Sequence, residues 1–378
     1  MMANIVHSTS RRLLPAVLAV AMAVVMGCGA ASALLGPSGG RVGSEAPEFQ
    51  GIVNWINSEP LTMEQLRGKV VLIDFWTYTC INCIRTFPFL KEWHDKYADK
   101  GLVIVGVHAP EFEFEKLTGN VINSANSFGL EYPIAQDNDF VTWNNYSNRF
   151  WPAKYLIDSE GVVRYTHFGE GDYQSTEDFI RKLLEDTGAD LTGVAPSAII
   201  APELAPEARP GNVTRELYGG YQRNASRGGI YVAQEAYYGG SERIVSYVDQ
   251  GDHLNHRIYL QGSWFNGLEE LRHARKTEDY EDYIAIKFSA TTVNAVVNPL
   301  ADSPFEVQVT IDGRPLSVEE AGPDVIVTDG RSYFKVDEGR LYQVVALAEY
   351  STHELSLSSN SDNFALFAFT FGAYQDGP

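Results

Sequence analysis

Cysteine is scarce in this sequence, and its scarcity excludes a fold held together by disulfides. Only three cysteines occur in 378 residues, whereas disulfide scaffolds need many cysteines in even pairs. A structural zinc site needs four ligands, commonly two Cys-X-X-Cys pairs or one pair with closely spaced histidines. The sequence has a single Cys-X-X-Cys pair and no two histidines separated by three to five residues. We therefore expect no metal, and each cysteine needs its own explanation.

Basic residues are also few. The chain carries 29 lysines and arginines against 49 aspartates and glutamates, which gives a formal net charge of -20. Such a charge repels phosphate backbones and anionic lipid headgroups unless a local basic patch intervenes, and we find no such patch. We expect no nucleic-acid partner. With 44% hydrophobic residues, the chain is long and apolar enough for two domains.

Acidic residues are absent before Glu45, and the N-terminal stretch has the pattern of an export signal. Paired arginines precede an apolar run, Leu13–Met26, that is too short for a permanent membrane span of about 20 residues. Its end, Val25-Met26-Gly27-Cys28, resembles the bacterial lipobox, which implies lipid modification of Cys28. The alternative is an ordinary signal peptide that happens to contain a cysteine. We predict a signal peptide with a lipobox over 1–28 and a membrane-anchored lipoprotein on the periplasmic, extracytoplasmic side of a bacterium.

The remaining sequence divides by composition. Residues 29–44 are rich in Gly, Ala and Ser and nearly uncharged, which is typical of a flexible tether. Residues 45–190 show mixed α/β patterns, and the proline-containing stretch 191–212 lacks periodicity and is interpreted as a linker. From 213 to 378 only strand patterns recur. We predict an α/β domain followed by an all-β domain.

A buried strand marks the centre of the α/β domain. Val70–Phe75 is a near-continuous apolar run, which indicates a central strand in a sheet that helices cover. A helix from about Cys80 to Tyr97 leads to a second apolar run, Leu102–Val107, so the two strands should be parallel neighbours. The pattern then predicts a helical stretch at 112–128, strands at 132–135, 151–158 and 162–168, a helix at 140–148, and a last helix that Thr176 caps and that ends near Glu185.

Short strand patterns separated by turns fill the C-terminal segment. In Phe305–Ile311 apolar and polar residues alternate, as in a half-buried antiparallel strand. We predict a β-sandwich or jelly roll. A glycan is a candidate ligand, because aromatic side chains stack on sugar rings, although most aromatics of β proteins belong to cores. The candidate aromatics are Tyr218, Tyr221, Tyr231, Tyr237, Tyr238, Trp264 and Phe265.

Cys80 and Cys83 form a pair that can cycle between dithiol and disulfide. Cys80 follows a strand and begins a helix, where the helix dipole and unpaired backbone N–H groups favour a thiolate. We expect Cys80 to attack a disulfide and Cys83, one turn further, to resolve the mixed disulfide. This chemistry needs no cofactor beyond the redox-active Cys80–Cys83 disulfide. Arg85 is interpreted as a solvated side chain, and the alternative is that it adds positive charge near the cysteines.

The residues around this pair resemble the thioredoxin-like proteins. Ile73–Cys83 is similar to their motif of a buried strand, Asp-Phe-Trp and Cys-X-X-Cys. Pro88 follows Cys83 at the position where thioredoxins kink their active-site helix. Trp151-Pro152 precedes a strand, where the family carries a cis-proline that faces the cysteines. The resemblance implies a thioredoxin-like fold, with Pro152 in the catalytic site and its peptide bond cis.

Asp74 lies in the middle of an apolar strand, where a lone carboxyl group should have a raised pKa. In the thioredoxin pattern this acid is catalytic and assists proton transfer during resolution, whereas the alternative is an acid that reaches solvent. Thr79 replaces a tryptophan of thioredoxins, and we expect it to alter the surface presented to a partner. The predicted border of the site comprises Trp76, Thr79, Ile81, Asn82 and Trp151.

An insertion between Val107 and Trp151 resembles the TlpA-like and cytochrome c maturation proteins. Trp76–Cys83 together with Gly106–Phe112 looks most like the soluble part of DipZ-type proteins, which pair this domain with a β domain similar to carbohydrate-binding modules. The resemblance implies a thiol-disulfide oxidoreductase that reduces envelope proteins or apocytochrome c. Because a lipid anchor replaces the membrane domain of DipZ, the electrons would come from a separate membrane protein of the CcdA or DsbD type.

Two other functions stay open at this point. Thr77–Cys80 contains the Thr-X-X-Cys half of the peroxiredoxin motif, which favours a thiol peroxidase of the AhpC/TSA type, although Ile73 occupies the place of that motif's proline. Alternatively, the β domain is the main functional part, a module that binds glycan or protein and that the redox domain serves.

Overall fold

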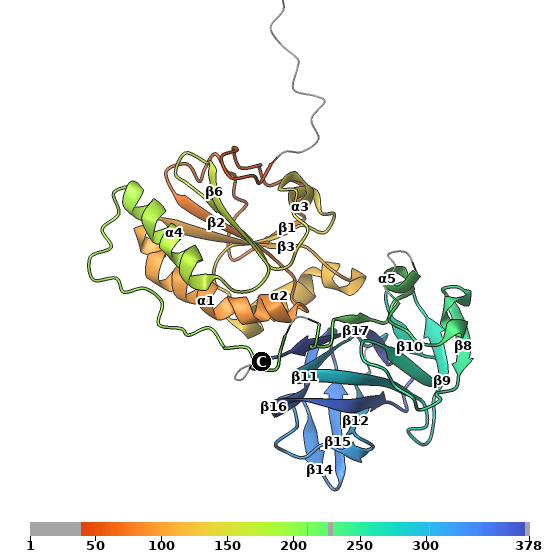
Figure 1. Cartoon of the computed structure of the whole chain (residues 1–378). Coiled ribbons are helices and arrows are strands. Elements are labelled where there is room, and N and C mark those ends of the chain that lie inside the picture. The colour runs from red at the N-terminus through yellow and green to blue at the C-terminus, as the bar shows by residue number, and fades with distance from the viewer. Residues whose placement is uncertain (1–38, 210, 226–229, 302, 375–378) are drawn as a thin grey trace, which may run out of the picture. The chain divides into compact units, whose positions relative to one another are not determined.

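The described part of the chain begins at residue 39. The computed structural model describes residues 39–209, 211–225, 230–301 and 303–374, all of which belong to one compact unit (Figure 1). The predicted signal peptide, the lipidation site Cys28 and the first part of the predicted tether lie outside the described residues. Among the described residues, no helix has both the length and the apolar character needed to cross a membrane.

A six-stranded mixed sheet forms the centre of the N-terminal domain. Strand β2 (Val70–Trp76) lies between β3 (Leu102–His108), which runs parallel to it, and β5 (Ala153–Ile157), which runs antiparallel. Every residue of β2 is buried, which confirms the predicted central strand. The sheet is completed, in the order β1-β4-β3-β2-β5-β6, by β1 (Asn54–Ile56), β4 (Ile134–Gln136) and β6 (Val163–Phe168).

Helices cover both faces of this sheet. Because side chains alternate along a strand, Asp74 and Trp76 point to one face of β2 and Phe75 to the other. One apolar core lies on the Trp76 side and a second on the Phe75 side. The first contains side chains of α1 (Ile81–Tyr97), α2 (Thr118–Phe128) and α4 (Tyr173–Asp186), and the second contains those of α3 (Val141–Asn145).

Two predicted helix boundaries were wrong for local reasons. The helical stretch predicted over 112–128 is divided, because Leu117 has extended backbone angles between a 3₁₀ turn, η2 (Glu113–Lys116), and α2. Thr176 does not cap the last helix. It lies inside α4, where its Oγ1 donates to Asp172 O at 3.0 Å, and Asp172 is the N-cap residue.

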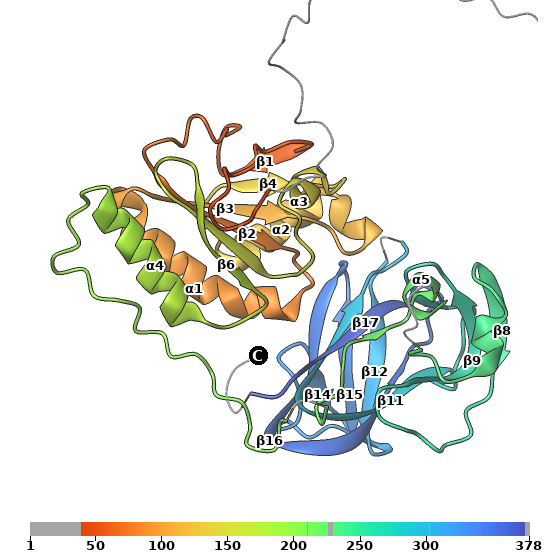
Figure 2. The same cartoon turned by 45° about the horizontal axis from the view of Figure 1, so that its top comes forward.

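An all-β domain follows, as predicted, and we use the name β domain for the described residues from 213 onward. Its strands form an eleven-stranded, antiparallel sheet (Figure 2). The long strands β11 (Tyr283–Val297) and β16 (Arg340–Ser358) pair along most of their length, and bulges interrupt their register, which lets paired strands bend. The other strands are β7 (Leu217–Tyr218), β8 (Arg243–Tyr247), β9 (Ile258–Asn266), β10 (Leu271–His273), β12 (Phe305–Ile311), β13 (Arg314–Pro315), β14 (Ile326–Thr328), β15 (Arg331–Val336) and β17 (Ala365–Gly372). The described residues also form three further short helices, η1 (Ala98–Lys100), α5 (Tyr221–Ala225) and η3 (Glu235–Gly239).

Aromatic residues considered for sugar stacking are in part core residues of the β domain. Trp264 and Tyr237 are fully buried. Trp264 Nε1 donates to Gln261 O at 2.8 Å, and the indole ring packs edge-on against Phe364. A buried aromatic ring whose polar atom is satisfied stabilises the fold and presents no face to a ligand. The interpretation of Trp264 as a sugar platform was therefore wrong.

The described ends of both predicted flexible segments contact the N-terminal domain. In the predicted tether, Gly43 N donates to Val163 O at 2.8 Å. In the predicted linker, Val194 O accepts a hydrogen bond from Arg181 at 2.9 Å. Both segments therefore include residues that are packed onto the domain beside them.

Phe75 should make a large contribution to the stability of the second core. Its ring lies 5.5 Å from that of Trp143 and 5.6 Å from that of Tyr155. Phe75→Ala should lower the free energy of unfolding by about 3–5 kcal/mol, because truncation leaves a cavity. Urea denaturation of the full chain measures this change in the free energy of unfolding. Phe150→Ala is the matched control, since Phe150 is 52% exposed, and it should change stability by about 0.5 kcal/mol or less. Equal losses in the two variants would contradict this assignment of the core.

Candidate redox-active site

Two free thiols lie at the start of α1. Cys80 is the N-cap residue of this helix, and its half-buried Sγ accepts a hydrogen bond from Cys83 N at 3.3 Å. The short connection Thr77–Thr79 joins the end of β2 to Cys80. The sulfur of Cys80 therefore occupies the place where helix N-termini bind anionic atoms.

Cys83 differs from Cys80 in its surroundings. Its side chain is fully buried. Burial raises the pKa of the Cys83 thiol well above its ordinary range, and the hydrogen bond and charge of Cys80 and the charge of Asp74 raise it further. Cys83 is therefore held as a thiol, and a nearby base would be needed to remove its proton.

A buried acid and a buried lysine lie beneath the thiols. Asp74 is fully buried, as predicted, and burial raises its pKa to about 7, although the charge of Lys154 lowers it. Lys154 stands directly opposite Asp74 on β5, with Nζ 3.9 Å from Asp74 Oδ1. Burial lowers the pKa of Lys154, and Asp74 partly reverses that effect. The ring of Tyr173 lies 5.8 Å from Lys154 Nζ. The pair can share one proton away from solvent.

The Trp151–Pro152 peptide bond is cis, as predicted. Trp151 Nε1 donates to Ala109 O at 3.0 Å, which ties this turn to the segment that follows β3. Beside the turn, Phe150 and Phe168 expose about half of their side chains, and their rings lie 5.5 Å apart. The proline turn therefore adjoins an exposed apolar surface.

Thr79 is not part of the surface presented to a partner, contrary to expectation. It is 2% exposed, and its Oγ1 donates to Glu115 Oε1 at 2.6 Å. Glu115 is itself fully buried, and its Oε2 accepts hydrogen bonds from Phe112 N at 2.9 Å and from Glu111 N. Burial raises the pKa of Glu115, and the hydrogen bonds from Thr79 and the backbone lower it. The residue before Cys80 is thus held from inside the molecule.

Arg85 is buried rather than solvated, which corrects its interpretation from the sequence. Its Nη1 lies 3.3 Å from Asn82 Oδ1 and 3.6 Å from Glu170 Oε2. Its guanidinium lies over the ring of Tyr374, 4.9 Å from the centroid. Through Asn82, this enclosed charge contacts the residues between the two cysteines.

Two predicted border residues have packing roles. Trp76 is fully buried, and its ring meets those of Phe87 at 5.3 Å and His108 at 4.9 Å, both edge-on. Ile81 is 2% exposed and belongs to the same core. Pro88 lies within α1, which continues on both sides of it. These residues fix the position of α1 against the sheet.

Lys154 and Glu115 are the functional candidates that sequence reasoning missed. Lys154 lies two residues after Pro152 in an apolar strand. Its place opposite Asp74 depends on how that strand pairs with Val70–Trp76, and the sequence alone does not give this pairing. Glu115 gave no local signal, because the charged run Glu111–Lys116 resembles a solvated surface.

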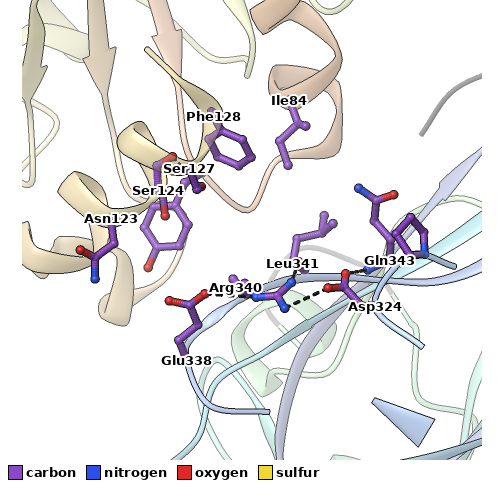
Figure 3. Close-up of a pocket in the computed structure, with 12 residues that line it drawn as sticks. Ile84, Asn123, Ser124, Ser127, Phe128, Asp324, Glu338, Arg340, Leu341 and Gln343 are labelled. Carbon is purple, nitrogen blue, oxygen red and sulfur yellow. Dashed lines mark hydrogen bonds and ion pairs between the residues drawn. The ribbon is translucent and has the colours of Figure 1, made fainter. Parts of the chain in front are cut away.

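A cavity of about 370 Å³ lies beside the start of α1 (Figure 3). Ile84 and Phe128 line it from the N-terminal domain, and Leu341 lines it from the β domain. Arg340 pairs there with Asp324 at 2.9 Å and with Glu338 at 3.3 Å. Neither cysteine lines this cavity, so it adjoins the thiols without containing them. Within the described ranges, no group of three or more His, Cys, Asp or Glu side chains could hold a metal ion.

Comparison with known proteins matches both domains. Residues 42–166 match the sequence model of the AhpC/TSA family, and residues 214–372 match a family described as a thioredoxin-like C-terminal domain. Protein DipZ of Mycobacterium tuberculosis (strain CDC 1551 / Oshkosh) is 36% identical over 333 residues, which are 86% of this chain and 43% of DipZ. The chain thus spans less than half the length of that relative.

The thiol-disulfide oxidoreductase YkuV of Bacillus subtilis (strain 168) is 33% identical over 142 residues, which are 37% of this chain and 95% of YkuV. A solved thioredoxin-like protein in the oxidised form is 32% identical and covers 38% of this chain and 95% of its own, with a TM-score of 0.35. Because YkuV is matched over nearly its whole length, this chain belongs to the thioredoxin-like thiol-disulfide oxidoreductases.

Proposed function

We propose that Cys80 and Cys83 carry out the thiol-disulfide exchange of this family. The contrast between the two thiols supports this assignment most strongly, because Cys80 is half-buried at a helix N-terminus and Cys83 is fully buried. The attacking thiol must reach a partner's disulfide, whereas the resolving thiol only needs to reach its neighbour. Cys80 is therefore the nucleophile and Cys83 the resolving thiol.

In the reductive direction the exchange has two steps. The Cys80 thiolate attacks one sulfur of the partner's disulfide, that bond breaks, and the other sulfur leaves with the electron pair and takes up a proton. Cys83 then loses its proton and attacks Cys80 Sγ, which breaks the mixed disulfide and forms the Cys80–Cys83 disulfide. The partner leaves as a dithiol, reduced by two electrons that the protein has lost.

Asp74 accepts the proton of Cys83 in the second step. A general base works best when its pKa is near the working pH, and burial raises the pKa of Asp74 to about 7. Lys154, with Nζ 3.9 Å away, stabilises the carboxylate after it has lost its proton. Trp151 and Pro152, whose turn adjoins the exposed rings of Phe150 and Phe168, receive the extended chain of the partner.

We further propose that the protein is a lipoprotein anchored through Cys28 outside the cytoplasm. There it would reduce envelope proteins or apocytochrome c, and a separate membrane donor of the CcdA or DsbD type would return its electrons. The export pattern of the first residues and the similarity to DipZ support this placement.

A thiol peroxidase is the second candidate, because residues 42–166 match the AhpC/TSA family. Thr77 is fully buried, and its Oγ1 lies 3.4 Å from His108 Nε2, so its hydroxyl is engaged inside the domain. A peroxidase would consume hydrogen peroxide with a thiol donor at a rate that depends on Cys80. Absence of that consumption in a protein that reduces insulin would reject the peroxidase.

A trapping variant tests the roles of the two thiols. Cys83→Ser cannot resolve the mixed disulfide, so it should accumulate partner proteins bound through Cys80, and mass spectrometry would identify them. Cys80→Ser is the matched control and should trap none, because its remaining thiol is buried. The wild type should reduce insulin, and both variants should fail to do so. An inactive wild type together with an empty trap would refute the proposed function.

The proton transfer predicts a pH dependence. Asp74 is deprotonated above its pKa of about 7 and can then accept the proton of Cys83, so resolution should accelerate as the pH rises through 7. Asp74→Asn should slow resolution about 100-fold and remove this rise. Release of a chromophoric thiol from a mixed disulfide on Cys80 measures the rate. Asp158→Asn, at a half-buried site outside the thiol pair, serves as control. An unchanged pH profile in Asp74→Asn would exclude Asp74 as the base.

A further inference from the structure

The segment Glu111–Glu115 contacts both the redox site and the β domain. On the redox side, Glu115 Oε1 accepts the hydroxyl of Thr79 at 2.6 Å. On the other side, Glu111 Oε1 lies 2.7 Å from Arg223 Nη2. The two contacts lie four residues apart on one short, mostly buried segment.

An aromatic cluster fixes the middle of this segment. Phe112 and Phe114 stack with an interplanar angle of 5° and a centroid distance of 5.8 Å. Both rings meet Phe367 of β17 edge-on, at 5.1 Å and 4.8 Å. Phe367 is 5% exposed. Large buried rings contribute strongly to an interface, so this cluster ties the segment to the β domain.

A second contact from the β domain reaches the cysteine motif on α1. Tyr374 lies against Arg85, and Arg85 donates to Asn82, which stands between the cysteines. The β domain is thus linked to the motif indirectly on both flanks, through Glu115 to Thr79 and through Arg85 to Asn82. A binding module joined by a flexible linker would need neither contact.

Burial of the Glu115 carboxyl group is energetically unfavourable, which suggests that Glu115 has more than a structural role. It is fully buried, and none of the ion pairs among the described residues includes it. Burying a carboxyl group without a cation is unfavourable unless hydrogen bonds satisfy it. Neutral donors do so here, namely the side chains of Thr79 and Thr77 and the backbone N–H groups of Glu111 and Phe112. This arrangement holds the Thr79 hydroxyl in one place, directly before Cys80.

We propose that the β domain is a fixed part of the redox site, and that it holds Glu115 as a positioning residue that sets the equilibrium between the dithiol and disulfide forms of Cys80 and Cys83. This inference rests on the proposed function of the cysteine pair. A contact that is stronger in one of the two forms shifts the equilibrium toward that form, so loosening these contacts should move the equilibrium.

The equilibrium with glutathione tests this proposal on the full chain. Two glutathione thiols reduce the Cys80–Cys83 disulfide and leave as one glutathione disulfide, so that two electrons and two protons pass to the protein. Thr79→Val, Glu115→Gln and Phe367→Leu should each shift the equilibrium constant of this exchange in the same direction, by about threefold to tenfold, the range expected for one lost hydrogen bond. The double variant Thr79→Val, Phe367→Leu should shift it no further than its stronger single variant, because both break one chain of contacts.

Phe334→Leu is the matched control. Phe334 is fully buried in the β domain, and its ring packs on Tyr342 at 5.1 Å. The Phe334→Leu variant should leave the equilibrium constant with glutathione unchanged, even though it lowers the free energy of unfolding. Arg223→Gln, which breaks the pair with Glu111, replaces Phe367→Leu if that variant does not fold. The proposal would be overturned if Phe367→Leu and Arg223→Gln both kept the wild-type equilibrium constant with glutathione. It would also be overturned if the shifts of the two single variants added up in the double variant. Failure of insulin reduction and trapping would refute the proposed function instead, since the glutathione constant does not depend on a partner.

Discussion

The complete burial of β2 is the constraint on which the redox site depends. A strand with neighbours on both edges and helices on both faces offers no water to any of its side chains. An acid in such a strand keeps its proton up to an unusually high pH, and burial accordingly raises the pKa of Asp74 to about 7. The same strand ends at Trp76, which delivers the chain to the N-terminus of α1 and puts Cys83 inside the core. One feature thus supplies both the thiols and their base.

The parts of the site that follow from local chain order could be predicted from the sequence. Cys80, Cys83 and Asp74 lie within one strand-to-helix connection, and the near-continuous apolar run around Asp74 is enough to predict its burial. The cis form of the Trp151–Pro152 bond followed from the family resemblance and is confirmed. Lys154 could not be found in this way. Its role depends on the register between β2 and β5, which two separate apolar runs do not specify.

The same limit explains the wrong interpretations of Thr79 and Arg85. A threonine and an arginine beside an active site are usually exposed, and nothing in their own neighbourhood indicates otherwise. Thr79 is buried because Glu115 turns inward to meet it, and Arg85 is buried because Glu170 and Tyr374 enclose it. These partners lie far away in the sequence. Composition could separate the two domains, but it could not show that the β domain contacts the cysteine motif.

Two buried acids lie around the thiols, and their electrostatic surroundings determine what each of them can do. Asp74 and Glu115 are both fully enclosed, yet their surroundings differ. Asp74 faces Lys154 at 3.9 Å with no hydrogen bond from a described residue to either carboxyl oxygen, whereas Glu115 accepts hydrogen bonds from neutral donors. A titratable pair suits a group that must take up and release a proton, because small energies move the proton between states. A carboxyl group held by several hydrogen bonds suits a fixed support, since each donor is oriented and none is charged. The two acids therefore divide the work of moving a proton and of holding the residue before the nucleophile.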